Sequence, residues 1–476
     1  MISIVISLAV LLIGFALYSR VVDKIFGPDD RETPAIAIND GVDCIPMKPW
    51  RSLLVQLLNI AGTGPIFGAI MGACFGPVVF LWIVLGGLFG GVVHYYMSAM
   101  MSSRHKGESI AELSGAYLGK GALWLMRIVS VLLLTLTCTV FASSPAALIA
   151  QLTPKGLGLT FWVVVILAYY VLATILPIDK IIGRIYPFFG VLLIIMAVSI
   201  FGGLIAGGYK IPEISLSNLH PDGLPVWPFM FVTVACGAIS GFHATQSPMV
   251  AKCITSEKQG RMVFGGAMMI ESIIAMVWAA AGVAFYGATD VLSKTIGGMG
   301  QSGAVYEISQ GLLGTTGGIL AIVGVIVCPI TSGDTSLRSA RLILAEMFHL
   351  DQKSIKNRLV ITLPMLVIVG VLTQVDFSVI WRYFGWTNQT LAMVSLWVAT
   401  SYLIKNSRYR FGSLVTALPA AFMSAVSMTY LLMAKEGFSL PASVGYPAGA
   451  AFAAALFIVY AVALRRSSNV SQGQAF

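Results

Sequence analysis

The sequence predicts an all-helical membrane protein with about 13 transmembrane helices, two of which are broken near the membrane midplane. The prediction depends on composition, on recurring apolar stretches, and on glycine and proline residues that interrupt two of these stretches. Of the 476 residues, 57% are hydrophobic and 10% are charged, and the mean hydropathy is +0.88. A soluble domain carries about a quarter charged residues, so this composition excludes a soluble enzyme with a single anchor.

Apolar stretches of about 20 residues, the length that crosses a bilayer as a helix, recur along the whole chain. The first is expected to be a retained span rather than a cleaved signal peptide, because no basic residue precedes it and Arg20 and Lys24 follow it directly. Glycine, proline and charged residues mark the ends of the other spans. The expected spans cover residues 2–19, 52–75, 78–102, 121–150, 159–177, 185–207, 227–250, 262–287, 303–332, 359–374, 387–404, 411–433 and 443–464.

The basic residues are distributed unevenly between the connecting segments. With these spans, 24 of the 29 Lys and Arg residues lie on one side of the membrane and 5 on the other. Because cytoplasmic loops carry the excess of Lys and Arg, we expect a multi-pass protein of the bacterial plasma (inner) membrane with its N-terminus outside and its C-terminus in the cytoplasm. The excess of Lys and Arg in cytoplasmic loops accounts for the net charge of +9. The lipid bilayer is therefore an expected partner, and nucleic acid is not.

The six cysteines show no CxxC spacing, and most of them lie in apolar spans. We therefore interpret them as small buried hydrophobic residues. They are Cys44, Cys74, Cys138, Cys236, Cys253 and Cys328.

The stretch NIAGTGPIFG (59–68) is unusual for the middle of a membrane span. Gly62, Thr63 and Gly64 can leave helical geometry at little cost, and Pro65 suits the start of a new helix. A rise of about 1.5 Å per residue places this stretch about 15 Å from the start of the span, near the midplane of a core about 30 Å thick. Unpaired backbone at that depth is tolerated where it lines a cavity or is buried in protein.

A second interruption follows five spans later, in ACGAISGFHATQSPM (235–249), which contains Gly237, Gly241 and Pro248. Because five is an odd number, this span runs in the opposite direction to the first broken span. The pattern predicts an inverted repeat of two five-span units, each opening with a discontinuous helix, as in secondary transporters. The alternative is that these glycines only allow close helix packing.

The inverted repeat divides the chain into four parts. An extra span and a cytoplasmic loop occupy residues 1–50, repeat A covers 51–210, repeat B covers 211–410, and two accessory spans with a tail occupy 411–476. We expect a binding site near the midplane, where half-helix N-termini offer N–H groups to an anion and freed carbonyls suit a cation.

Four stretches, in order along the chain, resemble a known family. They are NIAGTGPIFG (59–68), SGFHATQSPM (240–249), TSGDTSLRSAR (331–341) and FGWTNQTLA (384–392). Together they resemble the carbon starvation protein A (CstA) family, with its related pyruvate transporters, in the amino acid–polyamine–organocation superfamily. The resemblance implies a leucine-transporter-type core of five plus five helices and ion-driven uptake of pyruvate or peptides. The familiar enteric members are much longer, so this chain would be a compact variant that lacks their additional C-terminal portion.

The exposed amides around Thr63 and Gly64 are expected to receive a substrate carboxylate, and polar side chains near both breaks would add hydrogen bonds. His243 is the most specific candidate, because an imidazole can donate to an anion or accept a proton near neutral pH. The alternative for His243 is a hydrogen bond to a helix backbone. The expected substrate-binding residues are Gly62, Thr63, Gly64, Ser240, His243, Thr245 and Gln246.

The resemblance also implies a candidate Na⁺ site. In leucine-transporter-type folds, a common sodium site combines carbonyls of the first broken helix with hydroxyls of the eighth core helix, here the expected span 303–332. The implied ligands are Ala61 and Gly64 through their carbonyls and Thr331 and Ser332 through their hydroxyls. The alternative is that the two hydroxyls only bond the local backbone. No covalent cofactor is expected.

Coupling to protons is the alternative to sodium. Glu271 and His94 lie inside expected spans, where ionisable side chains are costly unless they are paired or functional. Asp334 and Arg338 have a helical ion-pair spacing and are expected at the cytoplasmic mouth, as a gate or as a structural ion pair.

The sequence therefore predicts a secondary active transporter that imports a small carboxylate, pyruvate first and a peptide or amino acid second, coupled to Na⁺ or H⁺. A channel is expected to show a pore-lining ring or filter sequence instead of an internal repeat. An enzyme would need clustered catalytic groups, whereas the five histidines are scattered and no HExxH motif is present. The chain also has no GxxxxGK[ST] motif that would indicate direct ATP drive.

Overall fold

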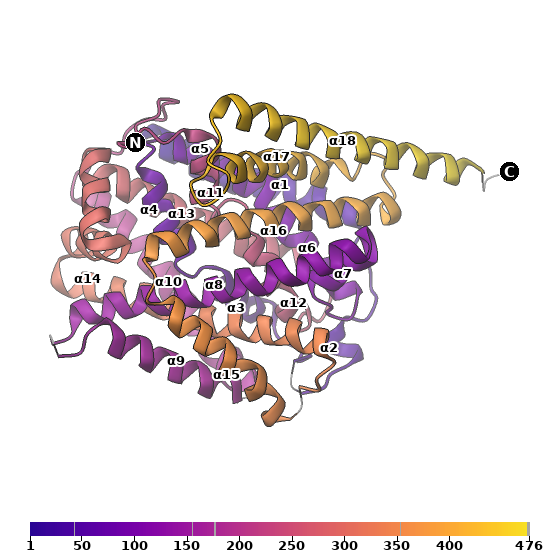
Figure 1. The fold of residues 1–476 in the computed structure, drawn as a ribbon, viewed down its shortest axis with the longest axis horizontal. Coiled ribbons are helices and arrows are strands. Elements are labelled where there is room, and N and C mark those ends of the chain that lie inside the picture. The colour runs from indigo at the N-terminus through magenta and orange to yellow at the C-terminus, as the bar shows by residue number, and fades with distance from the viewer. Residues whose placement is uncertain (42, 155, 176–177, 353, 474–476) are drawn as a thin grey trace.

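The computed structural model describes residues 1–41, 43–154, 156–175, 178–352 and 354–473, and no strand occurs in these ranges. Figure 1 shows long helices packed side by side, with the C-terminal end of α18 extending beyond the rest of the molecule. The α-helices are α1 (Ile2–Phe26), α2 (Pro34–Ala37), α3 (Pro49–Ile60), α4 (Ala69–Ala73), α5 (Val78–Leu85), α6 (Val92–Arg104), α7 (Ile110–Leu118), α8 (Lys120–Leu152), α9 (Leu159–Ile175), α10 (Ile178–Ala206), α11 (Phe231–Thr233), α12 (Gly241–Ala251), α13 (Gly266–Phe285), α14 (Thr289–Phe348), α15 (Ile355–Leu372), α16 (Phe377–Asn406), α17 (Leu414–Met433) and α18 (Ala442–Gly473). Shorter π-helical or 3₁₀ segments are η1 (Gly64–Gly68), η2 (Gly86–Gly91), η3 (Val226–Met230), η4 (Glu257–Gln259) and η5 (Arg261–Gly265).

The interrupted helices lie at the centre of the packing. Helix α14 packs against α8, α10 packs against both α14 and α3, and α12 packs against α6 and α16. Every residue from Val55 to Ile70 is buried, so the first interrupted helix is enclosed over its whole middle part. By contrast, only 22% of the apolar window of α1 and 11% of that of α18 is buried, and these two helices lie at the periphery.

Nine of the described helices are long and apolar enough to cross a membrane, and α3 with Gly64–Ala73 forms a tenth candidate, bent by 59°. The other three predicted spans coincide with α9, with α16 and with the interrupted segment from η3 to α12. Residues 176 and 177, the end of one predicted span, lie outside the described residues. Every predicted span therefore contains a helix, while the number of about 13 crossings stays a prediction.

One predicted span overlaps its candidate membrane-crossing helix only in part. The stretch 303–332 belongs to α14, which changes direction at Gly300 (φ +71°) and Gly314 (φ +67°), and the part long and apolar enough to cross a membrane is Gly317–Phe348. The charged residues that follow position 332 suggested the end of a span. The structure instead keeps them helical and buried, with exposed fractions of 1% for Asp334 and 5% for Arg338.

Candidate binding site at two helix breaks

The first break lies where the sequence predicts it. Helix α3 ends at Ile60, Ala61 leaves helical geometry, and a new helical segment begins at Gly64. The Gly62 N–H donates to the Ile60 carbonyl at 3.0 Å, which forms a local turn in place of the helical bond to Leu58. The hydroxyl of Thr63 is buried and has no hydrogen-bond partner among the described residues.

The second break is shorter than predicted. The chain is helical up to Thr233 and again from Gly241, so the non-helical residues are 234–240 rather than all of 235–249. Pro248 does not end α12, because the Ser247 hydroxyl donates to the Ala244 carbonyl that a proline cannot bond. The predicted side chains of His243, Thr245 and Gln246 therefore project from a restarted helix, and Ser240 stands at its N-terminus.

The two breaks approach each other closely through glycine. A Cβ atom on Gly64 would lie 2.3 Å from the Sγ atom of Cys236, and one on Gly62 would lie 2.5 Å from the ring of Phe141. Within the second break, Gly237 has a φ of +86°, and a Cβ atom there would lie 2.4 Å from that of Ala275. At these three positions the packing leaves no room for a larger residue, and at Gly237 the backbone conformation also favours glycine.

Side chains from α16 and α5 hold the second break. The Asn388 Oδ1 atom accepts hydrogen bonds from the Phe242 N–H at 2.7 Å and from the Ser240 hydroxyl at 3.1 Å, so it caps the start of α12. Gln389 donates to the carbonyl of Phe231 at 2.8 Å, on the other side of the break. Trp82 of α5 donates to the carbonyl of Val234, also at 2.8 Å.

The structure brings together two of the predicted residues, His243 of α12 and Glu271 of α13. Their Nε2 and Oε2 atoms lie 3.1 Å apart, and both side chains are fully buried. The contact has the distance of an ion pair but not the alignment of a hydrogen bond, and neither group has a hydrogen-bond partner among the described residues. The Cys236 Sγ atom joins this pair, with the three ligand atoms all within 4.8 Å of one another.

Two side chains of α6 lie near this cluster. The ring of Tyr95 is 5.2 Å from that of His243, measured between centroids. His94 precedes Tyr95, is 1% exposed, and lies close enough to His243 for the two imidazoles to interact electrostatically. Neither ring nitrogen of His94 has a hydrogen-bond partner in the described part of the chain.

Thr245 and Gln246 contact α14 through Ser339. The Gln246 amide donates to the Thr245 hydroxyl at 3.1 Å and to the Ser339 hydroxyl at 3.3 Å. The Thr245 hydroxyl donates to the Phe242 carbonyl of its own helix at 2.7 Å. The predicted substrate-binding residues thus divide into one group at the breaks and a second group between α12 and α14.

Of the two hydroxyls of the predicted Na⁺ site, one contacts the first broken helix. The Ser332 hydroxyl donates to the Leu58 carbonyl at 2.8 Å, the same carbonyl that the local turn at Gly62 releases. The Thr331 hydroxyl donates to the Cys328 carbonyl at 2.8 Å, within its own helix. Local bonding thus accounts for Thr331, whereas Ser332 links α14 to α3. The Na⁺ site itself stays a prediction.

Asp334 and Arg338 lie inside the candidate span Gly317–Phe348 rather than at an end of the helix. The Tyr186 hydroxyl donates to Asp334 Oδ2 at 3.2 Å, and the Arg338 guanidinium donates to the Ala173 carbonyl at 3.3 Å. Both side chains thus have polar partners inside the candidate span. Ser332, two residues before Asp334, contacts α3 next to the first break. Their predicted role as a gate stays a prediction.

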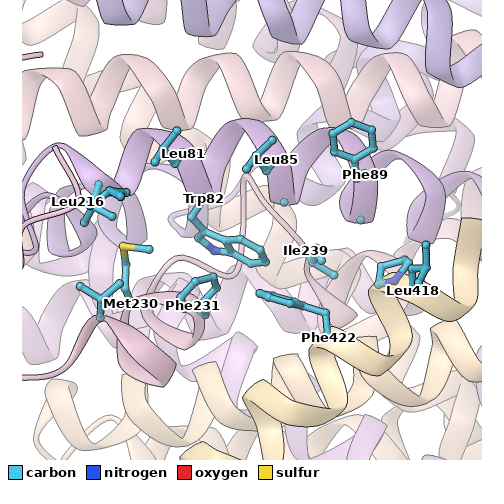
Figure 2. A pocket seen from close by; sticks show the side chains of 15 residues that line it. Leu81, Trp82, Leu85, Phe89, Leu216, Met230, Phe231, Ile239, Leu418 and Phe422 are labelled. Carbon is cyan, nitrogen blue, oxygen red and sulfur yellow. The ribbon is translucent and has the colours of Figure 1, made fainter. Parts of the chain in front are cut away.

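A cavity of about 500 Å³ lies beside the second break, but its lining is apolar. Figure 2 shows Trp82, Phe231 and Phe422 grouped around it, with Ile239 of the break next to them. The one polar group of Trp82, its indole N–H, already donates to the Val234 carbonyl. A carboxylate would find no donor here, so we place the polar site at the breaks and not in this cavity.

Sequence reasoning missed two participants, Cys236 and Ser339, and identified a third, Asn388, only in general terms. Cys236 was interpreted as a small hydrophobic residue, whereas it lies against Gly64 and beside the His243–Glu271 contact. Asn388 lies in the family-like stretch 384–392 at the start of an expected span, where a polar side chain is predicted to bond a neighbouring helix. That it caps the start of α12 depends on the fold. Ser339 belongs to the family-like stretch 331–341, but its contact with Gln246 depends on the fold.

Solved structures with the same fold are transporters. A manganese transporter of Eremococcus coleocola, as a point mutant, covers 90% of this chain and 99% of its own with a TM-score of 0.56 and 13% identity. MhsT in complex with L-phenylalanine covers 80% of this chain and 99% of its own (TM-score 0.55, 15% identity), and Mhp1, a nucleobase-cation-symport-1 family transporter, covers 89% and 93% (0.55, 15%). The protein therefore has the leucine-transporter-type fold with two discontinuous helices.

The chain belongs to the carbon starvation protein CstA family, whose sequence model matches residues 1–161, 153–304 and 286–430. An uncharacterized membrane protein of Haemophilus influenzae is 40% identical over 60% of this chain and 92% of its own length. The peptide transporter CstA of Bacillus subtilis is 25% identical over 93% of this chain and 92% of its own. The pyruvate/proton symporter BtsT of Escherichia coli is 26% identical over 58% of this chain and 48% of its own. Both the predicted family and the predicted fold are confirmed, and the protein is a membrane transporter.

Proposed function

We propose that this transporter imports a small carboxylate, with pyruvate as the first candidate, by alternating access coupled to a cation gradient. The observation that carries the proposal is the close approach of the two broken helices at Gly64 and Cys236, in the buried centre of the molecule. At the start of the helix that begins at Gly64, the Ile66 and Phe67 N–H groups already donate to the Thr63 carbonyl and Pro65 has no N–H. A ligand would therefore be bound by the N–H groups of Thr63 and Gly64, at the positive end of the helix dipole. A carboxylate is the natural ligand of such a terminus.

Side chains around the first break fit this substrate class. The Thr63 hydroxyl is buried, adjoins the start of the new helix, and has no hydrogen-bond partner among the described residues. An unsatisfied buried hydroxyl costs about 1–3 kcal/mol, and a bound carboxylate would remove this cost. Pyruvate is supported by the relative named as a pyruvate/proton symporter, and that name also favours the proton as the coupling ion. A site for Na⁺ at Ala61, Gly64, Thr331 and Ser332 is the competing proposal.

Peptide uptake is a second candidate, because the Bacillus subtilis relative that matches nearly the whole chain is named as a peptide transporter. A short peptide also presents a carboxylate, so the same helix N-terminus would bind either substrate. The peptide would need additional room for its residues.

The test is uptake of labelled pyruvate, and in parallel of labelled dipeptide, into proteoliposomes with an imposed proton gradient, a sodium gradient or neither. We expect pyruvate to accumulate with the proton gradient. Thr63→Val, which removes the hydroxyl and keeps the shape, should raise the KM for pyruvate about tenfold, the equivalent of about 1.4 kcal/mol. Thr137→Val is the matched control, since the Thr137 hydroxyl bonds its own helix in α8.

The proposal fails if folded protein accumulates pyruvate under neither gradient. Accumulation of dipeptide alone would establish the second candidate, and accumulation driven by sodium alone would favour the Na⁺ site.

A further inference from the structure

The cluster at the second break unites three kinds of metal-ligating atom. A thiol sulfur from Cys236, an imidazole nitrogen from His243 and a carboxylate oxygen from Glu271 lie within 4.8 Å of one another, and all three residues are buried. In the described part of the chain, this is the one place where at least three such side chains converge in this way. The nitrogens of His243 and the oxygens of Glu271 have no hydrogen-bond partner there.

We propose that Cys236, His243 and Glu271 form a binding site for a divalent transition metal of the zinc class, and that the bound metal inhibits transport. The inference goes beyond carboxylate transport and requires no particular substrate. Sulfur, nitrogen and oxygen ligands together match the preferences of Zn²⁺, whereas Na⁺, Mg²⁺ and Ca²⁺ take oxygen ligands.

The distances are close to those that a metal needs. Bonds of about 2.0–2.3 Å in a tetrahedral site place ligand atoms about 3.3–3.8 Å apart. The observed His243–Glu271 distance is 3.1 Å, and the largest separation in the cluster is below 4.8 Å. A small shift of the Cys236 side chain would complete a three-ligand set, and its thiol proton would be released to solvent on binding.

The neighbours of the sulfur also suit a metal-bound thiolate. The Ser240 hydroxyl lies 3.5 Å from the Cys236 Sγ atom, and the Asn388 amide nitrogen lies 4.0 Å from it. Such outer groups orient a ligand and stabilise its charge. Gly64 of the first break lies against the same sulfur, so a metal here would sit at the contact between the two broken helices.

Inhibition follows from where the three ligands originate. Cys236 belongs to the non-helical break, His243 to α12 and Glu271 to α13. Alternating access requires the discontinuous helices to move relative to their surroundings. A metal that bonds to all three segments would restrain that movement and favour one conformation, because a ligand shifts an equilibrium toward the state it binds better.

The first experiment measures binding without any transport substrate. Purified full-length protein in lipid nanodiscs is titrated with Zn²⁺ by calorimetry and with Cd²⁺ by ultraviolet absorbance, which reports a thiolate-to-metal charge-transfer band. We expect one saturable site and a thiolate band. Cys236→Ser should abolish the band and weaken Zn²⁺ binding by more than about 10–100-fold. Changes in outer groups alone cause a loss of that size, so the loss of a direct ligand should exceed it. Cys138→Ser, at another fully buried cysteine, should change neither.

Zinc binding that is unchanged in Cys236→Ser, or the absence of saturable binding to the wild-type protein, would overturn the site. If Cys236→Ser does not yield folded protein, Glu271→Gln provides the second variant. It should retain the thiolate band and bind Zn²⁺ with reduced affinity.

In proteoliposomes, Zn²⁺ should lower uptake by wild-type protein and by Cys138→Ser. Bound zinc that leaves uptake unchanged would overturn the inhibitory role. The binding result does not depend on the pyruvate assignment, because it is measured without substrate. The uptake arm uses whichever labelled substrate, pyruvate or dipeptide, the protein accumulates.

Discussion

The two broken helices are stabilised in different ways. At the first break the contacts are mainly steric, with Gly62 against Phe141 and Gly64 against Cys236, and a single hydroxyl, that of Ser332, reaches a released carbonyl. The second break is fixed by directed hydrogen bonds from two other helices. These come from Trp82, Asn388 and Gln389.

The difference indicates a division of roles between the breaks. The first break keeps polar groups without protein partners, Thr63 among them, and is therefore able to bind a ligand. At the second break, side chains of other helices bond the Phe231 and Val234 carbonyls and the Phe242 N–H, and Asn388 fixes the start of α12. We interpret the first as the break that binds the transported substrate, the binding break, and the second as the break that positions α12, the positioning break.

The largest expected effect tests the steric contact at the binding break. In Gly64→Ala the new Cβ would overlap the Cys236 sulfur, and overpacking of this kind costs about 1–3 kcal/mol. We expect pyruvate uptake to fall to background and the thermal unfolding temperature to drop. Gly121→Ala is the matched control, because a Cβ there meets nothing within 4 Å. Full uptake by Gly64→Ala would show that the breaks do not need this close approach.

A smaller effect is expected from removing the cap of the positioning break. Asn388→Ala leaves the buried Phe242 N–H without its acceptor, which costs about 1–3 kcal/mol in stability. We expect a lower unfolding temperature and reduced maximal uptake, measured in parallel with Asn406→Ala, which removes an ordinary contact to its own helix. Equal behaviour of the two variants would contradict the division of roles.

The smallest effect concerns the hydroxyl that reaches the binding break. Ser332→Ala removes the bond to Leu58, and a typical intramolecular hydrogen bond contributes about 1 kcal/mol. Thr331→Val, next to it, should be close to neutral because the Thr331 hydroxyl bonds its own helix. If Thr331→Val abolishes sodium-driven uptake, the Na⁺ proposal gains support and the local interpretation of Thr331 is wrong.

The sequence predicted both breaks because clustered glycine and proline weaken a helix through their own backbone properties, whatever the rest of the fold does. It misplaced the end of the second break, since the satisfaction of the Ala244 carbonyl by Ser247 is visible only in three dimensions. It also ended a span at position 332, because hydropathy alone does not show that Tyr186 and the Ala173 carbonyl provide partners for Asp334 and Arg338.

The site was predicted in part for a similar reason. His243 was identified by its place in the second break and by the chemistry of imidazole near neutral pH, and Glu271 by the cost of burying an ionisable group in a membrane span. Their contact joins residues of two different helices, which no local pattern records. The involvement of Cys236 depends on the bend at Gly237, which directs the chain past Gly64.

The buried charges on α14 affect how the topology of this protein can be mapped. A reporter enzyme fused at residues 333–340, where hydropathy suggests a loop, would cut the segment Gly317–Phe348 in half. A fusion at residue 333 would remove both Asp334 and Arg338 from the helix, and one at residues 334–337 would remove Arg338. We expect such a fusion to report an orientation that the intact chain does not have. Fusion points after Phe348, where α14 ends, avoid this artefact.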